Sequence, residues 1–167
     1  MITNKISQAG APASTARQSQ PNPPKRILVV DDDPSLRQIY TEVLTQADYE
    51  VDTAEDGAVA WDALQVNGYD LLITDNNMPN VTGVDLLKKV HAARMTLPVI
   101  MATGTYPAEE FSRYSWIQPD TTLLKPYSMA EFLGAVKEVL CVNDDARAEL
   151  SPPPAWQIRP SAECLRL

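Results

Sequence analysis

Five short apolar runs rich in branched residues recur along the chain, and this recurrence limits the folds that the chain can adopt. Each run has only four to six residues, and those at 27–30, 71–74 and 98–102 are almost wholly apolar, without a polar alternation. Such runs are typical of strands that are buried on both faces of a sheet. The predicted strands lie at residues 27–30, 49–54, 71–74, 98–102 and 121–124.

Each predicted strand is followed by a segment whose apolar residues recur at helical spacing. Pro34 suits the first turn of one such helix, and Ser128 is a suitable N-cap for the last. Strands that alternate with amphipathic helices predict an α/β fold with a parallel sheet covered on both faces. The predicted helices lie at residues 36–47, 57–66, 84–94, 108–116 and 128–140.

The two ends of the chain differ in composition from this core. Residues 1–24 are rich in Ser, Gln, Ala, Thr and Pro, and residues 143–167 contain three consecutive prolines. Such segments bury too little apolar area to order themselves. We therefore predict a flexible N-terminal tail at 1–24, one folded domain at 25–142, and a flexible Pro-containing tail at 143–167.

The composition excludes several classes of function. A net charge of −8 argues against general affinity for nucleic acid or an anionic membrane. The longest apolar runs are far too short to span a bilayer, and the N-terminus lacks the apolar stretch of a secretory signal. The two cysteines form no zinc or disulfide pattern. Together these features favour a cytoplasmic protein that contacts neither nucleic acid nor membrane.

Polar side chains gather immediately after the predicted strands. Asp31, Asp32 and Asp33 follow the first strand, and Asp75 follows the third. Strand four is followed by a Thr-Gly pair, and strand five by a lysine. Ligands of open α/β sheets bind at the carboxyl ends of the strands, so we expect these groups to share one rim. The acidic triplet alone would also suit a helix N-terminus, and a capping role for Asp33 is compatible with a site.

The chemistry of this set is coherent. Clustered carboxylates repel one another, and a divalent cation such as Mg²⁺ relieves that repulsion through oxygen ligands. A carboxylate such as Asp75 can act as a nucleophile towards phosphorus. Lys125 can pair with phosphoryl oxygens, and Thr103 can donate a hydrogen bond to them. The sequence therefore predicts a Mg²⁺-dependent site for phosphoryl transfer.

At this point the sequence resembles the response-regulator receiver family, in particular its single-domain, chemotaxis-regulator-like members. The similarity spans residues 26–141. It implies a flavodoxin-like, doubly wound sheet of five parallel strands in the order 2-1-3-4-5, with five helices. The residues that carry it are Ile27 to Pro34, Thr74 to Pro79 with Gly83, Thr103-Gly104, and Leu124 to Tyr127.

The resemblance also implies a role for each site residue. Asp75 would be the phosphoacceptor and a metal ligand, together with the acidic-pocket residues Asp31 and Asp32. Asn77 would bind the metal through its backbone carbonyl. Thr103 would be the switch hydroxyl and Lys125 the phosphate-sensing lysine. The peptide bond between Lys125 and Pro126 would be cis.

One position departs from the family pattern. The family commonly has an aromatic residue three positions before the lysine, and Thr122 stands there in this chain. We therefore expect one of two outcomes at the switch surface: either Tyr106 or Tyr127 substitutes for this ring, or the output change is a backbone movement of residues 103–117 alone.

The predicted function is a stand-alone response regulator. A sensor histidine kinase or a histidine phosphotransfer protein would phosphorylate Asp75, and the change would be signalled through the surface to a protein partner. The chain would catalyse its own phosphorylation and slow autodephosphorylation, without turnover of an external substrate. The runner-up is a degenerate receiver that acts as a constitutive docking module. A phosphohydrolase would need an acid where Asn77 stands, and a nucleotide binder would not place acids after strand one.

Overall fold

The computed structural model describes residues 23–150, with side chains described as far as residue 144. Five parallel strands form one sheet in the order β2-β1-β3-β4-β5, which confirms the predicted topology. The strands are β1 (Arg26–Val30), β2 (Glu50–Ala54), β3 (Leu71–Thr74), β4 (Val99–Thr103) and β5 (Thr121–Leu124).

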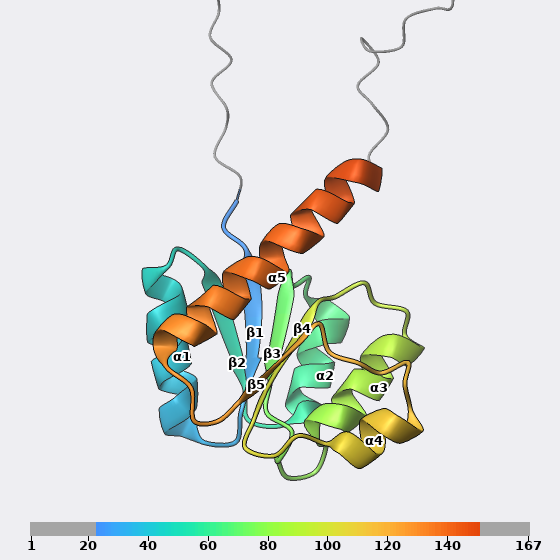
Figure 1. Ribbon diagram of the computed structural model, residues 1–167. Helices are drawn as coiled ribbons and strands as arrows, with labels where there is room; N and C mark the ends of the chain where they lie inside the picture. The colour runs from blue at the N-terminus through green and yellow to red at the C-terminus, as the bar shows by residue number, and fades with distance from the viewer. Residues whose placement is uncertain (1–22, 151–167) are drawn as a thin grey trace, which may run out of the picture.

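Helices cover both faces of the sheet. Figure 1 shows α1 and α5 on one side of the strands and α2, α3 and α4 on the other. The fold is thus a doubly wound α/β sandwich of the flavodoxin-like type, as the sequence predicts. The helices are α1 (Pro34–Gln46), α2 (Gly57–Val66), α3 (Gly83–Ala92), α4 (Ala108–Arg113) and α5 (Met129–Leu150).

Alternate residues of each central strand enter two separate cores. Leu28 and Leu72 pack with α2, α3 and α4, whereas Ile27 and Leu71 pack with α1 and α5. All four are fully buried. Because neighbouring strand residues point to opposite faces, an uninterrupted apolar run is what a sheet covered on both sides requires.

Side-chain caps begin several of the helices. Asp33 Oδ1 accepts a hydrogen bond from Ser35 N at 2.8 Å, so this acid caps α1 as predicted. Asp56 caps α2 by accepting from Ala58 N and Val59 N. Ser128 and Glu131 form a reciprocal capping box ahead of α5.

Helix α5 is longer than the sequence pattern indicates. It continues through residues 143–150, which we assigned to the C-terminal tail, and Figure 1 shows this end projecting beyond the sheet. The stretch contains no Gly or Pro before Pro152, and Ala, Arg, Glu and Leu are strong helix formers. Asn143 Nδ2 also donates to Val139 O at 2.7 Å. The rest of both predicted tails, residues 1–22 and 151–167, lies outside the described residues.

The helices of residues 23–150 are too short or too polar to cross a lipid bilayer.

Candidate functional site

Strand pairing brings the two main acidic positions together. In the β1–β3 ladder Val30 lies opposite Thr74, so Asp31 and Asp75 are the next residues along two adjacent strands. The N–H of Asp75 donates to Val30 O at 2.9 Å. Both residues are largely buried, with Asp31 2% exposed and Asp75 9% exposed as whole residues. Two acids are therefore held in a region where burying one uncompensated charge is already costly.

Lys125 reaches this pair from the edge strand of the sheet. Its Nζ lies 2.8 Å from Asp75 Oδ2 and 2.9 Å from Asp31 Oδ2. The backbone N–H of Lys125 donates to Thr103 O at 2.9 Å, which anchors the lysine beside the end of β4. One ammonium group thus bridges two carboxylates that come from two other strands.

The backbone holds the second oxygen of Asp75. Asp75 Oδ1 accepts hydrogen bonds from the N–H of Asn76 and, at 3.2 Å, from the N–H of Asn77. Hydrogen bonds to both oxygens fix the plane of this carboxyl group and favour its ionised form.

The ionisation states follow from these contacts. Burial raises the pKa of the Asp75 carboxyl, but the Lys125 ammonium and the two backbone N–H groups outweigh it, so the pKa lies below its ordinary value. Burial lowers the pKa of Lys125, but the Asp75 and Asp31 carboxylates raise it by more. The resulting pKa lies well above that of a free lysine. At neutral pH the site therefore contains the ionised Asp75 carboxylate beside the Lys125 ammonium group.

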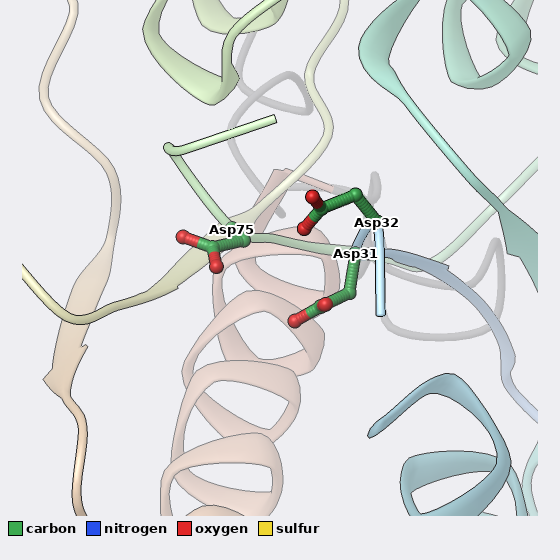
Figure 2. Close-up of side chains that lie close together, drawn as sticks. All are labelled: Asp31, Asp32 and Asp75. Carbon is green, nitrogen blue, oxygen red and sulfur yellow. The ribbon is translucent and has the colours of Figure 1, made fainter. Parts of the chain in front are cut away.

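A third carboxylate completes what we call the acidic pocket, formed by Asp31, Asp32, Asp75 and Lys125. One oxygen from each aspartate lies within 4.8 Å of the other two, and Figure 2 shows the three carboxyl groups gathered together. Asp32 is exposed, so the cluster opens to solvent. Three carboxylates against one ammonium leave an excess of negative charge. Hard oxygen donors at this spacing fit a divalent cation of the Mg²⁺ type.

The remaining predicted site residues lie around the pocket. Thr103 is fully buried at the end of β4, and its Oγ1 exchanges long hydrogen bonds of 3.3 and 3.4 Å with the backbone of Thr105. Asn77 lies in the loop after Asp75, and its backbone N–H donates to Asp75 Oδ1. The bond between Lys125 and Pro126 is cis, as the resemblance implies.

Close backbone packing shapes the loop that carries Asp75. A Cβ on Gly83 would lie 2.2 Å from the carbonyl oxygen of Asp75, so the start of α3 approaches the site more closely than any other residue type permits. Across the loop, Asn80 Nδ2 donates to Asp56 Oδ2 at 2.6 Å. Asp56, which also follows a strand, is therefore a cap and loop brace and does not join the acidic pocket.

The aromatic positions have different environments. Thr122 is partly buried and lies opposite Met101 in the β4–β5 ladder. Tyr106 is 45% exposed, with its ring 5.4 Å from that of Phe111. Tyr127 instead packs between α1 and α5, where its hydroxyl lies 2.5 Å from the hydroxyl of Tyr40. The sequence offers both Tyr106 and Tyr127 as substitutes for the missing ring. In the structure Tyr106 is exposed, whereas Tyr127 packs against the core.

Sequence analysis missed two residues next to the pocket. Arg37 Nη1 donates to the backbone oxygen of Asp31 at 2.5 Å, and Tyr40 pairs with Tyr127. Arg37 lies on α1, six positions after Asp31. The Tyr40–Tyr127 pair joins residues 87 positions apart, and no local pattern indicates such a contact.

Comparisons with known proteins all indicate the same family. The chain matches the response regulator receiver domain over residues 27–137. The sensor histidine kinase RcsC of Escherichia coli K12 is 36% identical over 121 residues, which are 72% of this chain and 13% of RcsC. The transcriptional regulatory protein CusR of the same strain is 29% identical over 69% of this chain and 51% of CusR. The chain thus corresponds to only part of these curated relatives.

Solved structures agree with this match. The chemotaxis protein CheY4 of Vibrio cholerae is 31% identical, with a TM-score of 0.64 over 70% of this chain and 98% of CheY4. The response regulator TrrA of Thermotoga maritima, in complex with Mg²⁺ and beryllium fluoride, is 33% identical, with a TM-score of 0.62 over 69% of this chain and 98% of TrrA. With its parallel sheet, its acidic pocket and these matches, the chain belongs to the response regulator receiver domain family.

Proposed function

We propose that this receiver domain accepts a phosphoryl group on Asp75, in a Mg²⁺-dependent reaction, from a sensor histidine kinase or a histidine phosphotransfer protein. The observation that supports this most directly is the position of Lys125, whose ammonium group contacts Asp31 and Asp75 together. A half-buried cation between two acids, with a third acid open to solvent, suits a site that receives further negative charge.

The transfer needs a nucleophile and compensation of charge. An oxygen of the Asp75 carboxylate attacks phosphorus, a P–O bond forms, and the P–N bond to the donor imidazole breaks with its electron pair returning to nitrogen. Lys125 pairs with the incoming oxygens, and the N–H groups of Asn76 and Asn77 keep the carboxyl group oriented. Positioning and charge compensation account for most of the catalysis of such transfers.

The cation would be held by the acidic pocket. We assign Asp31, Asp32 and Asp75 as carboxylate ligands and Asn77 as a ligand through its backbone carbonyl. When bound, Mg²⁺ supplies positive charge that offsets both the carboxylates and the phosphoryl oxygens.

Thr103 is suited to respond to the new group. Its hydroxyl now makes two long hydrogen bonds to Thr105, and contacts of that length are weak. A phosphoryl oxygen offers a stronger, charge-assisted acceptor, so we expect the hydroxyl to turn towards it. The segment that follows β4, which includes the exposed ring of Tyr106, would move with it and be recognised by a protein partner.

The relatives support the assignment of the phosphoryl donor. Receiver domains are phosphorylated by histidine kinases, and RcsC is itself named a sensor histidine kinase. We propose that the reaction is cytoplasmic. It would modify the chain itself, with slow autodephosphorylation and without turnover of an external substrate.

Intact-protein mass spectrometry tests the proposal. The native chain and Asp75→Asn would be incubated with acetyl phosphate in the presence and absence of Mg²⁺. We expect the mass of one phosphoryl group to be added to the native chain only, and only with Mg²⁺. Equal labelling of Asp75→Asn would place the chemistry at another residue. No labelling of either chain would favour the constitutive docking module.

A steady-state assay with a small phosphate ester separates the proposal from a phosphohydrolase. We expect no multiple turnover, because Asn77 cannot donate a proton as the carboxylic acid of such enzymes does. Sustained release of phosphate that depends on Asp75 would contradict this expectation.

A further inference from the structure

Three aromatic rings connect the acidic pocket to helices α1 and α5. Tyr40 on α1 stacks on Phe132 of α5, with ring centroids 4.7 Å apart and planes 26° apart. Tyr127, between β5 and α5, stacks on the same Phe132 ring, with centroids 6.2 Å apart and planes 10° apart. Tyr40 and Phe132 are both buried, so two of the three rings have fixed positions in the core.

We call Tyr40, Tyr127 and Phe132 the ring cluster. A hydrogen bond between the two tyrosine hydroxyl groups links two of its members. Tyr40 Oη and Tyr127 Oη lie 2.5 Å apart. Tyr40 is only 2% exposed, so water has little access to its hydroxyl. Burial raises the pKa of both phenols, so both are neutral at physiological pH and one donates to the other. A buried hydroxyl without a partner is unfavourable, which gives this bond a free-energy consequence.

The bond is coupled to the pocket through the chain. Tyr127 is two residues after Lys125, and the N–H of Lys125 is hydrogen-bonded to the end of β4. The charges of the pocket also act on the hydroxyls, because Asp31 and Asp75 both raise the pKa of each phenol. A change in the position of Lys125 therefore reaches Tyr127 through only two peptide bonds of the chain.

We propose that the hydrogen bond between Tyr40 and Tyr127 is a positioning contact that favours the unphosphorylated arrangement of Lys125 and is released when Asp75 is phosphorylated. The inference rests on the proposed function. In the present arrangement Lys125 Nζ is shared between Asp31 and Asp75. A phosphoryl group moves the negative charge outwards from β3, and Lys125 follows it. Tyr127 moves with the lysine, whereas the buried ring of Tyr40 stays.

The consequence is a change at the surface where α1 meets α5. Tyr40 belongs to α1, and the ring of Tyr127 lies against Phe132 of α5. Release of the bond removes a polar link between the loop after β5 and α1. Hydrogen bonds depend steeply on distance and angle, so a small displacement of Tyr127 is sufficient.

Linkage gives a test. A contact present only in the unphosphorylated state opposes phosphorylation, so its removal must favour the phosphorylated state. Beryllium fluoride with Mg²⁺, the combination bound in the TrrA structure, serves as the probe of that state. Its affinity would be measured by isothermal titration calorimetry for the native chain, Tyr40→Phe, Tyr127→Phe and the double variant. Phenylalanine retains the stacked rings, so the fold is expected to be retained.

We expect each single variant to bind beryllium fluoride about three- to tenfold more tightly than the native chain, the range that one hydrogen bond supports. The double variant should bind no more tightly than the single variants, because both changes remove the same bond. Tyr49→Phe is the matched control. Tyr49 packs against the same core, its pKa is also raised by burial, and it lies outside the ring cluster, so the affinity should not change.

Unchanged or weaker affinity in both single variants would overturn the inference, and so would fully additive effects in the double variant. A structural role alone would lower the unfolding temperature of both states and leave the affinity as it is. If the native chain itself fails to bind the probe, the proposed function fails instead, and the two failures are thereby distinguished.

Discussion

Charged residues gather at both ends of the parallel strands, but in different ways. We call the end where the strands finish the carboxyl edge of the sheet, and the end where they begin the amino edge. The carboxyl edge carries the acidic pocket. The opposite edge carries what we call the amino-edge cluster, in which Arg26 pairs with Asp52 at 2.5 Å and Lys25 pairs with Asp144 at 2.6 Å. The members of the cluster are Lys25, Arg26, Asp52, Tyr69, Asp70 and Asp144.

Exposure distinguishes the two edges. The side chains of Asp31 and Asp75 are 3% and 11% exposed, whereas those of Asp52 and Asp144 are 40% and 51% exposed. Ion pairs in water contribute little to stability, typically about 0–1 kcal/mol. Buried acids of like charge are costly to keep, and are typical of sites that bind or react. The amino edge therefore joins elements of the fold, and the carboxyl edge has the properties of a functional site.

The aromatic partner of the amino-edge cluster illustrates the same point. Tyr69 donates its hydroxyl hydrogen to Asp52 at 2.8 Å, and the guanidinium of Arg26 lies 5.0 Å from the centre of its ring. Burial and the Asp52 carboxylate raise the pKa of Tyr69 to about 12. The two cations and the phenol of this cluster each contact a carboxylate, as is typical of ion-pair groups that join elements of a fold.

The largest expected difference between the edges follows from removing their cations. Lys125→Met leaves two largely buried carboxylates without their shared ammonium, and we expect it to lower the free energy of unfolding by about 2–3 kcal/mol without Mg²⁺. Arg26→Met, the matched change at the amino edge, should cost about 0–1 kcal/mol. Urea unfolding measures both values. Equal losses would contradict the distinction drawn here.

Metal affinity is the next test. Asp32→Asn removes an exposed carboxylate of the pocket, and we expect Mg²⁺ affinity to fall by about tenfold, or about 1.4 kcal/mol, as charge is lost from a hard-cation site. Asp52→Asn removes an acid from the other edge and should leave the affinity unchanged. Calorimetric titration with Mg²⁺ alone compares the two variants, and similar losses in both would exclude a site localised to the pocket.

Acid sensitivity should also depend on the pocket. The pKa of Asp75 in the folded chain lies below its unfolded value of about 3.9, so its ionised form contributes stability above that pH. This contribution is lost as the pH falls through the folded pKa. We therefore expect the stability of Asp75→Asn to decline less steeply with falling pH than that of the native chain. Unfolding measured between neutral and acidic pH tests the slope, and parallel curves would contradict the assignment.

The smallest effect is expected at the far end of α5. Lys25→Met breaks the exposed pair with Asp144, and we expect a loss of less than about 1 kcal/mol in local protection of residues 143–150. Hydrogen exchange of these amides measures it. Since salt screens exposed charges, the difference from the native chain should vanish near about 1 M salt. A difference that persists at high salt would indicate a role for Lys25 beyond the ion pair.

Much of the fold could be predicted because the signals are local. The apolar runs at 27–30 and 71–74 each form a strand, and Asp33 and Ser128 begin the helices that their positions predict. The end of α5 could not be placed in the same way. Residues 143–150 have helical propensity but no core-facing periodicity, and the contact of Asp144 with Lys25 joins positions 119 residues apart.

The site shows the same division. The sequence by itself determined which reactive residues follow which strands, because strand ends are visible in the hydrophobic pattern: Asp31, Asp75 and Lys125 could be chosen before any coordinates. Only the tertiary structure decided that one ammonium group spans two strands to hold both acids, and that Tyr127 pairs with Tyr40. These outcomes depend on distances between residues far apart in the chain. Such distances are fixed by strand order, register and core packing acting together, and a local pattern does not encode them.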